Sequence, residues 1–411
     1  MRFGKTMTAI AAAAVLTVPA NAEGKTYEGE NGGSVILQNY LVLKENANVP
    51  EVTFTYAIAA GSAMNATDTG LAVFAGDDAH AVTGMPVISD AEFETGQQTF
   101  ADIQKFKDEV NIRKYDSEMN VLDEPFTLED GMKYARSDIA VDFSGVVFRE
   151  PGVYRYIVTE NASGSTTGIV DDADLTRVLD VYCEHDGATG EVVITGYVLH
   201  NSEASAEALR DGTDPAGKSL GFVNAYETHD LTVQLTVSGN QASRDEYFEV
   251  PVSITDAMPG AVFDVDLSGC DEVTKLNGIN AETHTNPSQL TADENGAVTA
   301  TLWLQHGQEA KIQGLSANTK YTANENRTTL DQEGYTGNAS KVSGDDDVAA
   351  DQDAVSLSDT VTGITSDTVL LFHNTKDGLV PTGISAGMMP AAGAAAALAL
   401  LGMLRRKKKN G

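Results

Sequence analysis

The chain is poor in cysteine and lacks the short motifs of common enzymes. Its 411 residues hold two cysteines, Cys183 and Cys270, in a strand-like and a loop-like segment of different predicted domains, so we expect no bridge between them. The seven histidines show no metal-ligand spacing, and no metal site is predicted. Because a nucleophile elbow, a P-loop and a dinucleotide glycine motif are all missing, we expect neither catalytic residues nor a cofactor.

Positive charge is also scarce. The sequence carries 27 basic and 60 acidic residues, for a formal net charge of -33. Arg2, Lys5 and the basic cluster at 405–409 lie in terminal segments that we expect to be processed, so the remaining chain is still more acidic. Since phosphate binding needs clustered Lys and Arg, this balance excludes nucleic acid and anionic lipid as partners.

Long apolar runs occur only at the two ends of the chain. At the N-terminus, a short basic stretch at 1–6 precedes an Ala-rich apolar run at 7–19. Small residues follow at Ala20 and Ala22, the two positions that a signal peptidase reads. This order is typical of a secretory signal peptide, which we assign to residues 1–22 with cleavage after Ala22.

The C-terminal run, residues 384–404, is almost uncharged and is followed by the basic cluster 405–409. About twenty apolar residues are enough for a transmembrane helix, and the basic cluster is expected to stay on the cytoplasmic side. Directly before the run stands the tetrapeptide Val380, Pro381, Thr382, Gly383. A plain membrane anchor would account for the span and the basic tail, but not for this tetrapeptide.

In this order the three parts resemble the cell-wall sorting signal of Gram-positive surface proteins, here residues 377–411. In that family a sortase cleaves between Thr and Gly and joins the Thr carbonyl to an amine of the wall or of another subunit. Pro381 and Thr382 are adjacent, so the motif is similar to the shorter V-P-T-G variant. The resemblance implies three things: a sortase and peptidoglycan or further pilin subunits as partners, membrane contact only through the C-terminal segment, and an extracellular, wall-anchored location.

Between the two ends, short segments alternate apolar and polar residues and are separated by Gly, Asn, Asp or Pro. They are rich in Val, Ile, Thr, Tyr and Phe, which predicts an all-β sandwich chain. Trp303 alternates within one of them and is expected in the core. The predicted strands span residues 34–43, 53–58, 139–143, 152–159, 177–182, 191–198, 231–237, 248–254, 261–267, 297–304, 310–312, 321–323 and 368–373.

A shared layout divides the segments into two units. Each opens with a strand, has a late strand ending near a Glu, and closes on a strand that ends on an Asn. We predict two tandem Ig-like, pilin-type sandwich domains over residues 23–226 and 227–376, stacked as a stiff rod. We also expect a short helix at 204–210 and a solvated loop at 345–347. The insertion at 90–133 is a candidate adhesive surface.

Several segments carry a family resemblance over nearly the whole mature chain. Residues 141–145 and 148–160 resemble the streptococcal backbone-pilin domain, also called the FctA-like or isopeptide-linkage domain. The second predicted domain is similar to that of pilin-like proteins at 231–233, 237–243, 304–308 and 372–378.

The resemblance implies a self-made amide between a Lys on the first strand and an Asn on the last, assisted by a buried Glu. In the first domain, Glu160 and Asn224 match the acid and the acceptor, but Gln38 and Asn39 stand where the Lys is expected. In the second domain, Glu325 and Asn374 match, and Leu235 stands at the Lys position.

Because none of these substitutes offers an amine, we expect neither domain to form the bond. The matching residues are then ordinary polar residues of the sandwich. A bond made by a Lys elsewhere stays open, with Lys44 and Lys311 as the nearest alternatives.

The resemblance also implies a pilin lysine, the amine that receives the sorting Thr of the next subunit. It precedes the closing Asn of the first domain by a few residues, and Lys218 occupies that place ahead of Asn224. An ordinary surface lysine is the alternative interpretation.

These patterns together predict a secreted structural protein, a sortase-anchored subunit of a pilus or fimbria on a Gram-positive wall. The alternative is a monomeric wall-anchored adhesin that binds a host glycan or matrix protein. A wall-bound hydrolase is a third class, for which the sequence holds no motif.

Overall fold

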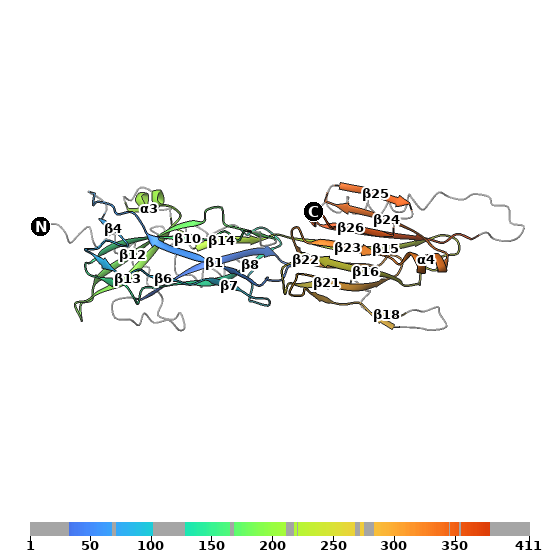
Figure 1. Cartoon of the computed structure of the whole chain (residues 1–411), viewed down its shortest axis with the longest axis horizontal. Helices are drawn as coiled ribbons and strands as arrows, with labels where there is room; N and C mark the ends of the chain where they lie inside the picture. The colour runs from blue at the N-terminus through green and yellow to red at the C-terminus, as the bar shows by residue number, and fades with distance from the viewer. Residues whose placement is uncertain are drawn as a thin grey trace, which may run out of the picture.

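The computed structural model describes residues 33–67, 71–101, 128–164, 168–210, 218–219, 221–267, 272–274, 283–344, 346–352 and 355–378. Strands dominate these residues, as the alternating pattern predicts. Figure 1 shows an elongated molecule in which residues 34–226 and residues 228–375 form two β-rich bodies that lie end to end. We call them the N-terminal half and the C-terminal half.

Two facing sheets build the N-terminal half. The first contains, in order, β11 (Ile169–Val170), β14 (Gly221–Tyr226), β1 (Ser34–Lys44), β8 (Met132–Asp142) and β6 (Val87–Ile88). The second contains β13 (Val192–His200), β12 (Thr176–His185), β10 (Gly152–Glu160) and β3 (Tyr56–Ala60), with β4 (Val73–Ala75) also paired to β10. Two short ladders, β2 (Val52–Phe54) with β7 (Ala91–Phe93) and β5 (Val82–Thr83) with β9 (Val147–Phe148), complete it, and α3 (Glu203–Arg210) follows β13.

The C-terminal half repeats this plan. Its larger sheet contains, in order, β20 (Gln289–Thr291), β17 (Val262–Asp266), β22 (Glu309–Ser316), β15 (Thr228–Ser238), β27 (Thr368–Thr375), β24 (Thr336–Ser343) and β25 (Asp346–Gln352). The facing sheet contains β21 (Val298–Leu304), β16 (Phe248–Thr255), β23 (Lys320–Asn324) and β26 (Ser356–Asp359). The hairpin β18 (Glu272–Thr274) with β19 (Thr283–Thr285) and the helix α4 (Arg327–Glu333) lie outside these sheets.

Alternation along the strands builds the core between the sheets. In β1, Leu37 and Leu41 are fully buried, and each such side chain contributes about 1.5–3 kcal/mol when it leaves water. Aromatic rings cross from one sheet to the other: Tyr56 of β3 packs on Phe222 of β14, with ring centroids 5.2 Å apart. The inward positions of the strands are therefore the ones where a polar side chain needs a partner.

Each half places its first strand directly beside its last, and the two run parallel. In the N-terminal half β1 pairs with β14, and in the C-terminal half β15 pairs with β27. Gly221 starts β14 at a φ of 151°, where a Cβ would lie 1.8 Å from the Gln38 carbonyl oxygen. Only glycine lets the two backbones approach this closely, so Gly221 helps to set the register of the pair.

Polar contacts tie the two halves together at their junction. Asn46, in the turn after β1, donates to both carboxylate oxygens of Asp230 at 3.1 and 3.0 Å. Lys44 also crosses the junction and pairs with Asp367 at 3.0 Å. Within the C-terminal half, Lys311 binds the Asp230 carboxylate at 2.6 Å. The connection between the halves is therefore held by polar contacts from both Asn46 and Lys44.

The structure confirms most of the predicted strands and the predicted short helix, now α3. The single strand expected at 53–58 is wrong, because the chain divides there into β2 and β3, which pair with different strands. The solvated loop expected at 345–347 is wrong, because Asp346 and Asp347 belong to β25. This strand pairs only with β24 at the sheet margin, and edge strands tolerate charges that interior strands do not. The expectation for Trp303 is also wrong: Leu302 and Leu304 face the core, and Trp303 lies half-buried on the other face.

Candidate functional site

A hydrogen-bonded polar group lies inside the N-terminal half, at three of the residues identified from the sequence. Asn39 of β1, Glu160 at the end of β10 and Asn224 of β14 are all buried, with at most 1 % exposed. The Asn224 side-chain nitrogen donates to Glu160 Oε2 and to Asn39 Oδ1, each at 3.1 Å. Asn39 Nδ2 lies 3.3 Å from the same Glu160 oxygen. The structure thus brings together the acid, the acceptor amide and the residue at the predicted Lys position.

Tyr56 is a fourth member that the sequence analysis missed. Its hydroxyl donates to Glu160 Oε2 at 2.8 Å and also contacts the Asn39 side-chain nitrogen. Tyr56 opens β3, which pairs with the end of β10 in antiparallel register. The only available signal was its alternation with Phe54, which predicts an inward side chain but not its partner.

Burial sets the protonation of Glu160. Removal from water raises the pKa of this carboxyl to about 7, although the hydrogen bonds from Tyr56 and Asn224 act in the opposite direction. The remaining oxygen, Glu160 Oε1, has no hydrogen-bond partner among the described residues. Near neutral pH the group therefore exchanges between its neutral and charged forms.

The C-terminal half holds a reduced copy of this site. Asn374 of β27 donates to Glu325 Oε1 at 2.6 Å, and both residues are buried. The strand register makes the equivalence explicit. Asn224 lies opposite Leu41, two residues after Asn39, and Asn374 lies opposite Val237, two residues after Leu235. Leu235 therefore stands at the strand position that corresponds to Asn39.

Replacing the amide by Leu235 leaves the second site short of partners. Glu325 Oε2 and Asn374 Oδ1 have no hydrogen-bond partner within the described part of the chain. Burial raises the pKa of Glu325 to about 7, and only the bond from Asn374 opposes this shift. The second site is thus a carboxyl–amide pair, with a leucine where the first site has an asparagine.

Neither site contains an amine nucleophile among the described residues. Gln38 points out of the core, where its amide donates to Asp138 at 2.8 Å. The two alternative lysines, Lys44 and Lys311, are engaged by Asp367 and Asp230 at the junction between the halves. Among the described contacts of Glu160 and Glu325 there is no amine, so the geometry offers acid and acceptor without the group that would attack.

Lys218 lies directly before β14, in an antiparallel bridge opposite His200 at the end of β13. Its side chain is partly buried, and it takes part in contacts of its own. Lys218 therefore lies beside β13, the edge strand of the second sheet. It belongs neither to the Glu160 site nor to the Glu325 site.

Other predicted features fall outside the described residues. These are the signal peptide with Ala20 and Ala22, the tetrapeptide Val380 to Gly383, the apolar run and basic tail that follow it, most of the insertion at 90–133, and Cys270. Cys183 is a buried free thiol in β12. No helix in the described ranges is long and apolar enough to cross a membrane.

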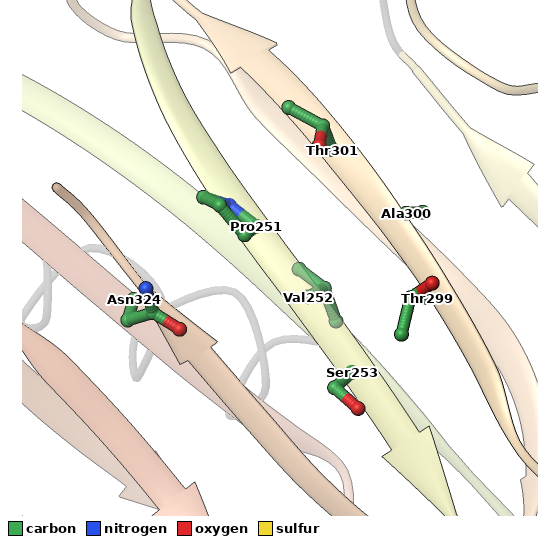
Figure 2. A pocket seen from close by; sticks show the side chains of 7 residues that line it. All are labelled: Pro251, Val252, Ser253, Thr299, Ala300, Thr301 and Asn324. Carbon is green, nitrogen blue, oxygen red and sulfur yellow. The ribbon is translucent and has the colours of Figure 1, made fainter.

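A shallow groove marks the outer face of the smaller sheet in the C-terminal half. It has a volume of about 270 Å³ and runs between β21, β16 and β23. Figure 2 shows its lining side chains, which are small: Pro251, Val252, Ser253, Thr299, Ala300, Thr301 and Asn324. The groove carries no charged side chain, and it lacks the convergent polar groups of a specific ligand site.

Part of the chain matches one family model of undefined role, and several solved structures are similar to the chain. Residues 229–365 match the family described as Domain of unknown function (DUF7601). No curated protein matches the chain. The fold is similar to that of the major pilin from Streptococcus pyogenes, at 19% identity over 85% of this chain and 100% of that chain, with a TM-score of 0.49.

Two further solved structures are similar. The major pilin T3.2 from Streptococcus pyogenes serotype GAS13637 has 19% identity over 85% of this chain and 99% of that chain, with a TM-score of 0.47. The pilus-presented adhesin Spy0125 (Cpa) has 20% identity over 49% of this chain and 37% of that chain, with a TM-score of 0.25. No residue role in this chain is taken from these structures.

Proposed function

We propose that this chain is a structural subunit displayed on a Gram-positive cell wall, fixed there by a sortase and joined into a pilus- or fimbria-like polymer. The observation that carries the proposal is the order of the C-terminal parts: the tetrapeptide 380–383, the apolar run 384–404 and the basic cluster 405–409. A membrane stop with a cleavable motif just outside it is what a transpeptidase at the membrane surface needs.

The strand layout supports a role under tension. The chain enters the N-terminal half at the start of β1 and leaves it at the end of β14, and these strands are parallel neighbours. It enters the C-terminal half at β15 and leaves at the end of β27, again a parallel pair. A pull on the two chain ends therefore loads each ladder along its length, so that many hydrogen bonds share the force rather than opening one by one.

In this proposal the stalk consists of two domains, residues 23–226 and 227–376, and neither is stapled by an internal amide. Stability then rests on packing and hydrogen bonds. The mass of the mature protein should accordingly equal the mass of its sequence, with no ammonia lost.

Lys218 is the proposed acceptor amine. The thioester carbonyl at Thr382 of one subunit would pass to the Lys218 Nζ of the next, with release of the sortase thiolate. The last subunit would be transferred to peptidoglycan instead.

A denaturing gel of wall extracts tests the proposal. Cells with the cognate sortase should show a ladder for the parent protein, loss of all wall-bound material for Thr382→Ala, and a single wall-bound band for Lys218→Arg. Lys320→Arg, a lysine paired with Asp256 in the other half, is the matched control and should keep the ladder. A single band for the parent itself would favour the monomeric adhesin.

A further inference from the structure

A buried charged cluster lies on the outer face of the second sheet of the N-terminal half, away from the Glu160 site. The Arg155 guanidinium of β10 binds Asp180 of β12 through two hydrogen bonds, from Nε at 2.7 Å and from Nη2 at 2.8 Å. His200 of β13 completes the cluster, with its Nε2 3.3 Å from Asp180 Oδ2. All three side chains are at most 5 % exposed.

Burying such a charged cluster costs free energy, and part of its hydrogen-bonding capacity is unused. Burial alone would raise the pKa of Asp180, but the Arg155 and His200 contacts hold it below its usual value, so the carboxylate stays charged. Neither ring nitrogen of His200 has an aligned hydrogen bond among the described residues, although the ring is 1 % exposed. A buried imidazole facing a fixed carboxylate, with its second nitrogen unpaired, is the arrangement of an oriented base.

The residue directly opposite His200 is Lys218. The antiparallel bridge between them is flanked by the hydrogen bond from Ser219 N to Leu199 O at 2.8 Å. This makes His200 and Lys218 a non-hydrogen-bonded pair, the type in which facing side chains lie on the same side of the sheet and come closest. The imidazole and the aliphatic base of the lysine are therefore neighbours.

We propose that Asp180, His200 and Lys218 act as a unit in which His200 takes up the proton released when the Lys218 amine attacks an acyl thioester. The inference rests on the acceptor role of Lys218 in the proposed function. The inference also gives a reason for the position of Lys218, because its strand neighbour His200 is a buried base that faces its own carboxylate.

The step balances as an acyl transfer. The Lys218 ammonium first loses one proton to solvent. The neutral amine then forms a C–N bond with the thioester carbonyl carbon, the C–S bond breaks, and the thiolate leaves with the electron pair. The second amine proton passes to the free nitrogen of His200, which later returns it to solvent.

Other charges face this unit from the neighbouring elements. Arg155 of β10 neutralises Asp180, and Glu203 and Glu207 of α3 act on Arg155 from outside the sheet. Tyr182 of β12 also interacts with Asp180, and burial raises its pKa. His200 is the group of the cluster placed to take up the amine proton.

Acylation of the mature protein by a synthetic Val-Pro-Thr thioester, followed by peptide mass spectrometry, tests this without a sortase. In the parent, the rate at Lys218 should exceed that at Lys320. His200→Gln should lower the Lys218 rate roughly 10- to 100-fold and leave the Lys320 rate unchanged. His185→Gln, on the exposed end of β12, is the control and should change neither rate.

Equal acylation rates at Lys218 and Lys320 in the parent would overturn the inference, and this result needs no variant to fold. A His200→Gln protein with the parental melting temperature and the parental Lys218 rate would also overturn it. A ladder that survives Lys218→Arg in cells would instead overturn the proposed function, so the two failures are distinguishable.

Discussion

The two buried glutamates, Glu160 and Glu325, occupy equivalent positions in the two halves but have different hydrogen-bond partners. The acid ends β10 in the N-terminal half and directly follows β23 in the C-terminal half, and the amide lies on the last strand of the facing sheet. In the N-terminal half, Asn39 and Tyr56 complete the group, and in the C-terminal half, Leu235 leaves two oxygens without partners. The acid–amide pair is therefore present with either third residue, and that residue decides whether the site is an extended network or a bare pair.

A lysine at position 39 should have the largest effect. Asn39→Lys places an amine beside Glu160 and Asn224, so Nζ should attack the Asn224 side-chain carbonyl with loss of ammonia. The new link would close a loop over a sequence separation of 185 residues, worth about 5 kcal/mol by the loop-entropy relation for cross-links. Intact mass should show one ammonia lost, and the melting temperature of the N-terminal half should rise by roughly 10–20 °C.

The double variant with Glu160→Ala is the control and should keep the full mass. Retention of ammonia in the single variant would mean that the first site is not the equivalent of a linkage site. Leu235→Lys is the parallel test in the C-terminal half.

The second prediction concerns pH. The folded-state pKa of Glu325 is about 7, above its usual 4.5, so the folded protein binds more protons than the unfolded chain between these values. The stability contributed by the neutral carboxyl is therefore full below about pH 4.5 and is lost as pH rises through 7, by up to about 3 kcal/mol.

Glu325→Gln removes this titration. Relative to the parent, the variant should become more stable by up to about 3 kcal/mol between pH 5 and pH 8, measured by urea unfolding followed through Trp303 fluorescence. Trp303 is the only tryptophan and lies in the C-terminal half. Glu294→Gln, in an exposed turn, is the control; a pH-independent difference for Glu325→Gln would show that the buried carboxyl does not titrate in this range.

The third prediction compares the two closing amides. Asn224→Ala removes the partner of Asn39, of Glu160 and of the Asp172 backbone N–H, and should cost about 2–3 kcal/mol. Asn374→Ala removes one bond to Glu325 and should cost about 1 kcal/mol. Calorimetry of both variants checks the order, and equal losses would mean that the network of the N-terminal half adds nothing.

The smallest expected effect comes from Tyr56→Phe. The variant loses the hydroxyl that donates to Glu160 and should destabilise the N-terminal half by about 1 kcal/mol at neutral pH. Because that bond lowers the pKa of Glu160, its loss should also move the titration of this carboxyl upward. Carboxyl NMR shifts against pH measure the change, and Glu325 serves as the internal reference.

Alternation of apolar and polar residues predicted most of the strands, because it arises where one face of a strand is buried. It predicted the strand at 34–43, in which the structure buries Leu37 and Leu41, and the repeat of Glu and Asn positions indicated two similar units. The parallel pairing of β1 with β14 joins residues far apart in the sequence, so only the family resemblance indicated that position 39 and Asn224 belong to one site.

Partners outside that resemblance could not be predicted. Tyr56 follows the ordinary alternation of its strand, and nothing local distinguishes it from a core tyrosine. Arg155, Asp180 and His200 come from three strands, and charged residues on strands usually indicate an exposed face. The acidic residues of β25 were assigned to a loop because the pattern does not show which strand lies at an edge.

The most direct test of the central claim is peptide mapping of the protein recovered from native cell walls. The account predicts a branched peptide in which the Thr382 carbonyl is joined to an amine, either Lys218 Nζ of another copy or a peptidoglycan amine, with Gly383 absent. Recovery of Thr382 still bonded to Gly383 in the wall-bound protein would contradict it.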